Sequence, residues 1–240
     1  MQNLYVVTGA TRGLGQALAK QIAAVSSNRL LTIGRAPSSE THVEADLAEP
    51  PSVERAGEEL VRRIAGSAFE RAVLINNAGV VSPVGPLEKL DAAELQGNLE
   101  VNLVAPIQLM RRFLLATSGA RLRRVINISS GAGRRPVYGW SAYCAAKAGL
   151  DMASRVVALE AQARGHAVEV CSLAPGVIDT GMQATVRGAD PVDFTDVERF
   201  RAMKEEGVLR PAAEVAADIL RLEAEGRLAG EVLQDLRALG

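Results

Sequence analysis

Residues that build disulfide frameworks, metal sites and membrane spans are scarce in this sequence. Its 240 residues include two cysteines, Cys144 and Cys171, and two histidines, His42 and His166. The cysteines form no CxxC pair, so neither a disulfide scaffold nor a zinc site is expected. No apolar run approaches the ~18 residues that cross a bilayer, and no basic segment precedes the first apolar run as in a secretory signal. These absences predict a metal-free cytoplasmic protein with reduced thiols and no membrane partner.

An excess of charge of one sign is also absent. The 27 basic and 28 acidic side chains leave a formal net charge of −1, so no overall positive field draws the chain to nucleic acid. A phosphate-bearing cofactor would need a local basic site. Repeats and long linkers are lacking as well, and 48% of the residues are apolar. This length and composition predict a single globular domain over residues 1–240.

Short aliphatic runs alternate along the chain with longer stretches rich in alanine and leucine. Strands are expected at residues 4–7, 29–33, 42–45, 72–75, 124–128, 167–173 and 231–234. Helices are expected at residues 13–25, 50–65, 141–164 and 92–117, the last broken or kinked near Pro106. The alternation predicts an α/β fold, with a Rossmann-type, doubly wound parallel sheet of about seven strands covered by helices on both faces. Ligands of such folds bind beyond the carboxyl ends of the strands.

A glycine-rich turn joins the first expected strand to the first expected helix. The segment TGATRGLG, residues 8–15, carries Gly9, Gly13 and Gly15 in the spacing GxxxGxG. Glycine permits a tight turn and close backbone approach, and a helix N-terminus offers free N–H groups to a pyrophosphate. Glycines at such a turn also occur for packing alone. The position of the turn, after the first strand of the chain, favours dinucleotide binding.

The residues after the second and third strands bear on the type of nucleotide. Dinucleotide folds that bind NAD carry an acidic residue after the second strand, but here Gly34 is followed by Arg35. Arg12 lies in the glycine turn itself. Two guanidinium groups suit a 2′-phosphate, which favours NADP(H), although both could be solvated surface arginines. Asp46, after the third strand, could receive the adenine amino group.

Tyr143 and Lys147, in the segment YCAAK, are candidates for acid–base chemistry. Their spacing places both side chains on one face of a helix. A free tyrosine has a pKa of about 10, too high for acid–base catalysis at neutral pH, and a nearby ammonium is expected to lower it. Such a pair also arises by chance on many helices, so its weight depends on the residues upstream.

Two polar residues upstream complete the candidate set. Ser130 ends the buried run VINISS and could donate a hydrogen bond to a substrate carbonyl, although a serine that caps the turn is an equal alternative. Asn102 is expected on a helix at the same end of the sheet. It could hold a water molecule that links the lysine to solvent.

Taken together, these motifs resemble those of the short-chain dehydrogenase/reductase family, and the resemblance covers essentially the whole chain. TGATRGLG, NNAG, Asn102, Ser130, YCAAK and Pro175-Gly176 occur in the family's order and rough spacing. The resemblance implies hydride transfer between a nicotinamide and a carbonyl or alcohol. It implies that Tyr143 acts as general acid, Lys147 binds the nicotinamide ribose, Ser130 polarises the carbonyl and Asn102 supports a proton relay. Further implied cofactor contacts are Gly9, Thr11, Arg12, Gly13, Leu14, Gly15, Asp46, Asn77, Ala78, Gly79, Pro175, Gly176, Val177, Ile178 and Thr180.

A narrower likeness rests on segments outside this shared core. Residues 124–152, 174–187 and 193–209 are similar to the bacterial benzil reductase branch, which itself resembles sepiapterin reductases. The branch implies NADPH-dependent reduction of an aromatic 1,2-diketone such as benzil to (S)-benzoin. A pterin or another ketone is the alternative substrate, and a non-catalytic NADP-sensing or scaffold protein is the alternative of another class. Only ten residues separate Arg35 from Asp46, so the second crossover helix of many members is nearly absent. Asp235 falls near the acidic pterin anchor of animal sepiapterin reductases, but a surface aspartate is the preferred interpretation.

Residues 176–210 form a long connection after the sixth strand, which is typical of a substrate lid. Residues 192–206 have helical character, and an apolar stripe there could either pack or touch substrate; it contains Phe194, Val197, Phe200 and Met203. Tyr138 and Trp140 could supply a flat apolar wall beside Ser130. The family resemblance also implies a homodimer or homotetramer.

Overall fold

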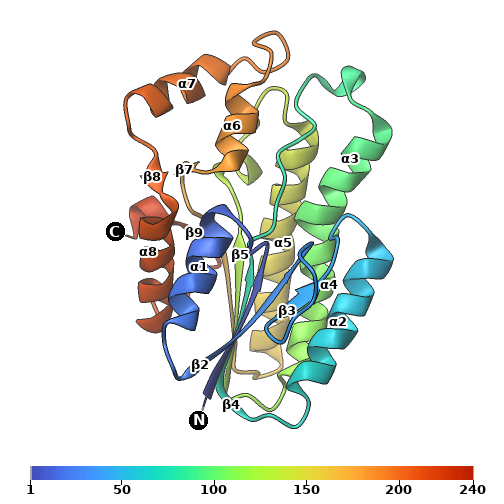
Figure 1. Ribbon diagram of the computed structural model, residues 1–240, viewed down its shortest axis with the longest axis vertical. Coiled ribbons are helices and arrows are strands. Elements are labelled where there is room, and N and C mark those ends of the chain that lie inside the picture. The colour runs from blue at the N-terminus through green and yellow to red at the C-terminus, as the bar shows by residue number, and fades with distance from the viewer. Residues whose placement is uncertain (1, 240) are drawn as a thin grey trace.

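The computed structural model describes residues 2–239 and places seven strands in one parallel sheet (Figure 1). Across the sheet the order is β3-β2-β1-β4-β5-β6-β9. The strands are β1 (Gln2–Thr8), β2 (Asn28–Gly34), β3 (His42–Glu44), β4 (Phe69–Asn76), β5 (Leu122–Ile128), β6 (Val168–Ala174) and β9 (Leu233–Asp235). The predicted doubly wound sheet is confirmed. Its strand order reverses between β1 and β4, the point where such sheets bind ligands.

Helices cover both faces of the sheet. Figure 1 shows α1 (Gly13–Ala23) and α8 (Ala212–Ala224) on one side, with α2 (Pro50–Ile64), α4 (Ala105–Ala116) and α5 (Ser141–Ala163) on the other. Alternation along the strands builds the two cores. In β1, for example, Leu4 and Val6 pack towards α2 and α4, whereas Tyr5 and Val7 pack towards α1 and α8. Among residues 2–239, no helix is long and apolar enough to cross a membrane.

The predicted helix over residues 92–117 is divided into three parts. It consists of α3 (Ala92–Leu99), a π-helical turn η2 (Glu100–Val104) and α4. Pro106 has no N–H to donate to the carbonyl of Asn102, which a regular α-helix would require. The wider π turn accommodates this loss and confirms the break expected near the proline. It also places Asn102 in the irregular turn, where π segments often accompany function.

The long connection after β6 forms a small layer above the carboxyl ends of the strands (Figure 1). It contains β7 (Ile178–Asp179), α6 (Gly181–Arg187), α7 (Val197–Glu205) and β8 (Arg210–Pro211), and β7 pairs with β8. The helix predicted over residues 192–206 starts later, at Val197. The reason is a turn in which the Asp190 carboxylate accepts the N–H of Val192 and the Asp190 carbonyl accepts the N–H of Asp193.

Helix α8 was not predicted. Its apolar residues Val215, Ile219 and Leu222 follow helical spacing and are buried against α1 and the sheet, so the signal was present in the sequence. Three short 3-10 turns complete the described chain: η1 (Leu87–Lys89), η3 (Gly131–Gly133) and η4 (Leu236–Ala238).

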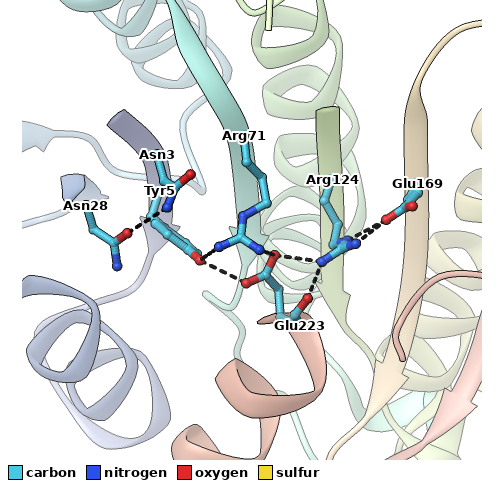
Figure 2. Close-up of polar contacts among 7 residues, drawn as sticks. All are labelled: Asn3, Tyr5, Asn28, Arg71, Arg124, Glu169 and Glu223. Atoms are coloured by element: carbon cyan, nitrogen blue, oxygen red, sulfur yellow. Dashed lines mark hydrogen bonds and ion pairs between the residues drawn. The ribbon is translucent and has the colours of Figure 1, made fainter. Parts of the chain in front are cut away.

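A buried ionic cluster fixes α8 to the sheet at the end away from α6 and α7. Figure 2 shows Glu223, at the end of α8, between Tyr5, Arg71 and Arg124 from three strands. The Glu223 carboxylate accepts from the Tyr5 hydroxyl at 2.8 Å and pairs with Arg124 at 2.7 Å. Arg124 also pairs with Glu169 of β6. The cluster therefore connects α8 with strands β1, β4, β5 and β6.

Candidate active site

The glycine turn is so tight that side chains do not fit in it. Gly9 has φ +67°, and a Cβ there would lie 2.8 Å from Cα of Ala78. A Cβ on Gly15 would collide with the carbonyl oxygen of Gly9 and with the Asn77 amide. Gly13 has φ +54° and faces Thr180. The predicted turn therefore needs glycine for its own geometry, and it brings Ala78 and Thr180 to the same place.

Hydrogen bonds join this turn to the end of β4. The Thr8 hydroxyl accepts the backbone N–H groups of Asn77 and Ala78 at 3.0 and 2.9 Å. The Asn77 amide donates to the carbonyls of Thr8 and Gly9 at 3.0 and 3.2 Å. The carboxyl ends of β1 and β4 are thereby locked at the point where the strand order reverses.

The N-terminus of α1 is open to an anion. Arg12 is extended before the helix and makes no side-chain cap, and the first turn holds no acidic residue. The helix dipole and the N–H groups of the first turn, which includes Leu14, therefore have no competing carboxylate. Thr11 and Arg12 are exposed beside them. The charge of a pyrophosphate suits this cradle.

The two predicted arginines follow the carboxyl ends of β1 and β2. Arg35 is exposed at the end of β2, and neither Arg12 nor Arg35 forms an ion pair within residues 2–239. Asp46, after β3, is exposed, and its carboxylate accepts the N–H of Ala48 at 3.0 Å. The short link between β2 and β3 leaves no helix over this end of the sheet.

Tyr143 and Lys147 lie one turn apart on α5, and both are buried. Nζ of Lys147 lies 5.7 Å from the centre of the Tyr143 ring and donates to the carbonyl of Ile128 at 2.9 Å. Burial raises the pKa of Tyr143 to about 12 and lowers the pKa of Lys147 to about 8. The prediction that the ammonium lowers the pKa of the tyrosine is therefore wrong for this structure, because loss of solvent dominates for both groups.

Ser130 lies two residues after the end of β5, next to Tyr143. Its hydroxyl accepts the N–H of Ala132 at 3.1 Å and so caps η3, as one interpretation of this serine predicted. It also hydrogen-bonds the Tyr143 side chain, which lowers the pKa of Tyr143 against the larger effect of burial. The same serine is thus both a cap and the neighbour of the tyrosine.

Asn102 reaches the other side of the lysine. A Cβ on Gly79 would lie 3.0 Å from Oδ1 of Asn102 and 3.7 Å from Nζ of Lys147, so these three residues meet. The Asn102 amide donates to the carbonyl of Val80 at 2.8 Å, and its Oδ1 accepts the N–H of Val80 at 3.2 Å. Its second Oδ1 lone pair remains available to a water molecule.

Aromatic residues meet above Tyr143. Trp140 stacks on Phe194 with ring centres 4.9 Å apart, and it meets the Tyr143 ring edge-on at 5.4 Å. Phe200 lies 5.9 Å from Trp140. The apolar side chains predicted on one face of residues 192–206 serve mainly for packing. Phe194, Val197 and Phe200 are buried with Trp140 in one cluster. Tyr138 stands apart from that cluster and is 51% exposed.

The segment after β6 lies at the same end of the sheet. Pro175 and Ile178 are buried, Gly176 has φ +81°, and the Val177 carbonyl accepts the N–H of Arg210. The side chain of Arg237 lies over Gly176, where a Cβ would be 3.5 Å from it. Arg237 also holds Asp235 through two hydrogen bonds, the nearer at 2.5 Å, which keeps the pKa of this carboxyl below its usual range. Asp235 is therefore not a free carboxylate.

One polar group beside the candidate set was not singled out from the sequence. The Asp151 carboxylate is buried next to Ser129, Ser172 and Arg134. A signal existed, because Asp151 follows Lys147 by four residues, as Lys147 follows Tyr143.

A doubly wound sheet with a glycine cradle at its switch point is typical of oxidoreductases that use a nicotinamide cofactor, and Ser130, Tyr143 and Lys147 lie at the same end of this sheet. The family model described as short chain dehydrogenase matches residues 3–190. The chain belongs to the short-chain dehydrogenase family.

Similarity to individual proteins supports this family assignment. The chain is 37% identical to "Benzil reductase ((S)-benzoin forming)" of Bacillus cereus, a match that covers 95% of this chain and 97% of the relative. It is 34% identical to sepiapterin reductase of Meriones unguiculatus, over 90% of this chain and 89% of that protein. A solved short-chain dehydrogenase/reductase from Brucella ovis, in complex with a partially ordered NAD, superposes with a TM-score of 0.67. It is 26% identical, and the match covers 98% of this chain and 99% of that one.

Proposed function

We propose that this protein is an NADPH-dependent carbonyl reductase whose substrate is an aromatic 1,2-diketone such as benzil, with (S)-benzoin as product. The observation that carries the proposal is the buried Tyr143 side chain, which contacts Ser130 on one side and the aromatic cluster around Trp140 on the other. A proton donor and an aromatic neighbourhood thus lie at the same residue. The full-length similarity to the Bacillus cereus benzil reductase supports the substrate class.

The proposed roles follow from the protonation states of these groups. When bound, the dihydronicotinamide supplies a hydride to the carbonyl carbon. The Ser130 hydroxyl donates a hydrogen bond to the carbonyl oxygen, and Tyr143 transfers its proton to that oxygen as negative charge develops there. The buried phenol keeps its proton at neutral pH, as a general acid must. The Lys147 ammonium stabilises the phenolate that remains, and Asn102 aids its reprotonation through water.

Preference for NADPH is proposed from Arg12 and Arg35. Both guanidinium groups are exposed where the adenosine ribose of a bound dinucleotide would lie. Gly34 stands where an NAD-binding site would carry a carboxylate. An arginine can bind a 2′-phosphate with two parallel hydrogen bonds, whereas NADH offers no such partner.

An aromatic diketone is preferred over a pterin because of Asp235. A pterin would present an amino group to a free carboxylate, but both oxygens of Asp235 are bound by Arg237. The aromatic cluster needs no such partner. Residues 176–210, which carry Phe194 and Phe200, are proposed to act as the substrate lid.

The test is NADPH oxidation, followed at 340 nm, with benzil, 1-phenyl-1,2-propanedione, sepiapterin and simple ketones, repeated with NADH. Strong turnover of benzil with NADPH is expected. Turnover of sepiapterin or simple ketones without benzil would keep the carbonyl reductase and reject the diketone. Tight NADPH binding without turnover of any carbonyl would favour the non-catalytic alternative.

A homodimer or homotetramer is proposed from an exposed apolar face. Ile107 and Leu115 on α4, with Met152, Val156 and Leu159 on α5, are exposed large apolar residues. Such patches are typical of protein interfaces. Light scattering coupled to gel filtration would give the mass, and a monomer at micromolar concentration would contradict this proposal.

A further inference from the structure

Asp151 is the one acidic side chain on the buried part of α5 that also carries Tyr143 and Lys147. It is 4% exposed, and α5 buries the apolar Leu150 and the polar Lys147 and Ser154 around it. A carboxylate is rarely buried without partners, because its desolvation costs several kcal/mol. The contacts of Asp151 therefore bear on what it does.

Three partners surround the Asp151 carboxylate, each from a different part of the chain. Oδ1 accepts the hydroxyls of Ser129 and Ser172, both at 2.6 Å. Oδ2 accepts Nε of Arg134 at 3.2 Å. Arg134 in turn donates to the carbonyls of Ser172 and Gln234. The ends of β5, β6 and β9 are thus tied to the middle of α5.

The hydrogen bonds of Asp151 lie directly beside the candidate catalytic residues. Ser129 precedes Ser130, and Arg134 follows the η3 turn that Ser130 caps. A Cβ on Gly133 would lie 2.8 Å from the carbonyl carbon of Lys147, so this turn rests on the backbone of the lysine. The Asp151 contacts hold both ends of the segment from Ser129 to Arg134 against α5.

We propose that Asp151 is a positioning residue for the carbonyl reduction: it fixes Ser130 relative to Tyr143 and maintains the positive charge of the Lys147 ammonium. The effect of Asp151 on the charge of Lys147 does not depend on the proposed function; only its effect on the reaction rate does. Loss of solvent around Lys147 favours the neutral amine, and the Asp151 carboxylate is the charged group that opposes this, since it raises the pKa of Lys147. A neutral Lys147 would stabilise a Tyr143 phenolate far less.

Few other titratable groups face this carboxylate. They are Lys147 on α5, Arg134 after η3, and Cys171 on β6, whose thiol pKa burial raises. Arg134 partly neutralises Asp151. Removing the negative charge should therefore lower the pKa of Lys147, and removing Arg134 should raise it.

The first measurement is the titration of Lys147 by NMR in protein carrying ¹³C at lysine Cε. The chain has four lysines, and only Lys147 is buried, so its signal can be assigned with Lys147→Arg. Asp151→Asn should lower the Lys147 pKa from about 8 by on the order of one unit. Asp151→Glu, which keeps the charge, should stay near the wild type. An unchanged Lys147 pKa in a folded Asp151→Asn protein would overturn the proposal, whatever the substrate proves to be.

The pH dependence of benzil reduction gives a second measurement. Asp151→Asn should lose roughly fivefold in kcat at pH 8 but recover towards the wild-type rate at pH 6, where Lys147 is protonated again. An equal loss at both pH values would indicate a purely structural role and reject the charge effect. If Asp151→Asn does not fold, Arg134→Gln provides the test with the opposite sign, and a Lys147 pKa that fails to rise in it would contradict the proposal.

Discussion

Glu223 and Asp151 are both buried acidic side chains bound to arginine, yet they lie at opposite ends of the sheet. Glu223 is fully buried and connects α8 to strands β1, β4 and β5 through Tyr5, Arg71 and Arg124 (Figure 2). Asp151 lies at the carboxyl ends of β5 and β6, one turn from Lys147. Similar chemistry thus serves the attachment of a helix at one end and the neighbourhood of the candidate catalytic residues at the other.

The two buried tyrosines show what separates the ends. Burial raises the pKa of Tyr5. The Glu223 carboxylate, which accepts a hydrogen bond from the Tyr5 hydroxyl, raises this pKa further. Burial also raises the pKa of Tyr143, but the Ser130 hydroxyl lowers it and an ammonium lies 5.7 Å from the ring centre. Tyr5 is surrounded by groups that keep its proton in place. Tyr143 is surrounded by groups that can stabilise the charge left when the proton moves.

The largest effect is expected from Tyr143→Phe. Removing the general acid should lower kcat for benzil by roughly 10²- to 10⁴-fold, while the melting temperature and NADPH binding stay near those of the wild type. Tyr5→Phe is the matched control at the other end, and it should leave kcat of the folded enzyme unchanged. Comparable turnover by Tyr143→Phe and wild type would remove the chemical distinction between the two ends.

Glu223→Gln should have the next largest effect, on stability. Neutralising this carboxylate removes one of the two charged partners of buried Arg124 and also the partner of Arg71, which should cost about 3 kcal/mol of unfolding free energy. Glu169→Gln, at a partly exposed member of the same cluster, should cost less than about 1 kcal/mol. Chemical denaturation measures both. A fall in kcat of the folded Glu223→Gln enzyme would show that the amino end also serves catalysis.

A smaller effect concerns the cofactor at the catalytic end. Arg35→Ser and Arg12→Ser should each raise KM for NADPH by about 10- to 100-fold, since each removes a charged hydrogen bond to the 2′-phosphate. KM for NADH should hardly change. Arg164→Ser, an exposed arginine just after α5, is the control. An NADH preference in the unmodified protein would reject the role proposed for both arginines.

The smallest effect is the stability cost of burying Lys147. Its pKa of about 8 in the folded protein lies below the ordinary 10.5, so between these values the unfolded chain holds a proton that the folded chain lacks. Unfolding free energy should therefore rise with pH across this window, by on the order of 1–2 kcal/mol between pH 8 and 10. Lys147→Met should lack this rise. Denaturation of both proteins at each pH, compared as a difference, isolates the contribution of the lysine.

Much of the fold could be predicted from local patterns. The seven strands and the first, second and fifth helices were expected near their observed places because aliphatic runs and helical spacing are short-range signals. The break near Pro106, where a π turn interrupts the helix, was also expected. One expectation failed for a local reason that residue periodicity does not capture, since the Asp190 turn delays the start of α7 to Val197. Helix α8 was missed although its spacing was visible.

The candidate site was predictable in membership but not in its electrostatics. The structure brings Ser130, Tyr143, Lys147 and Asn102 to one end of the sheet, as their motifs predicted. The direction of the Tyr143 pKa was wrong, because the spacing of two residues says nothing about how much solvent they lose. Their roles in catalysis remain predictions that the variants above will test.

The sequence by itself determined the family, the order of the elements and the glycines that the first turn requires, since each is encoded in contiguous residues. Three contacts were decided only by the tertiary structure. Asp151 binds Ser129, Ser172 and Arg134. Arg237 binds both oxygens of Asp235, and Phe194 stacks on Trp140. The physical reason is that desolvation and charge pairing depend on which distant segments enclose a group. The sequence specifies which titratable side chains are present, and their packing in the folded chain sets their pKa values and therefore their charges.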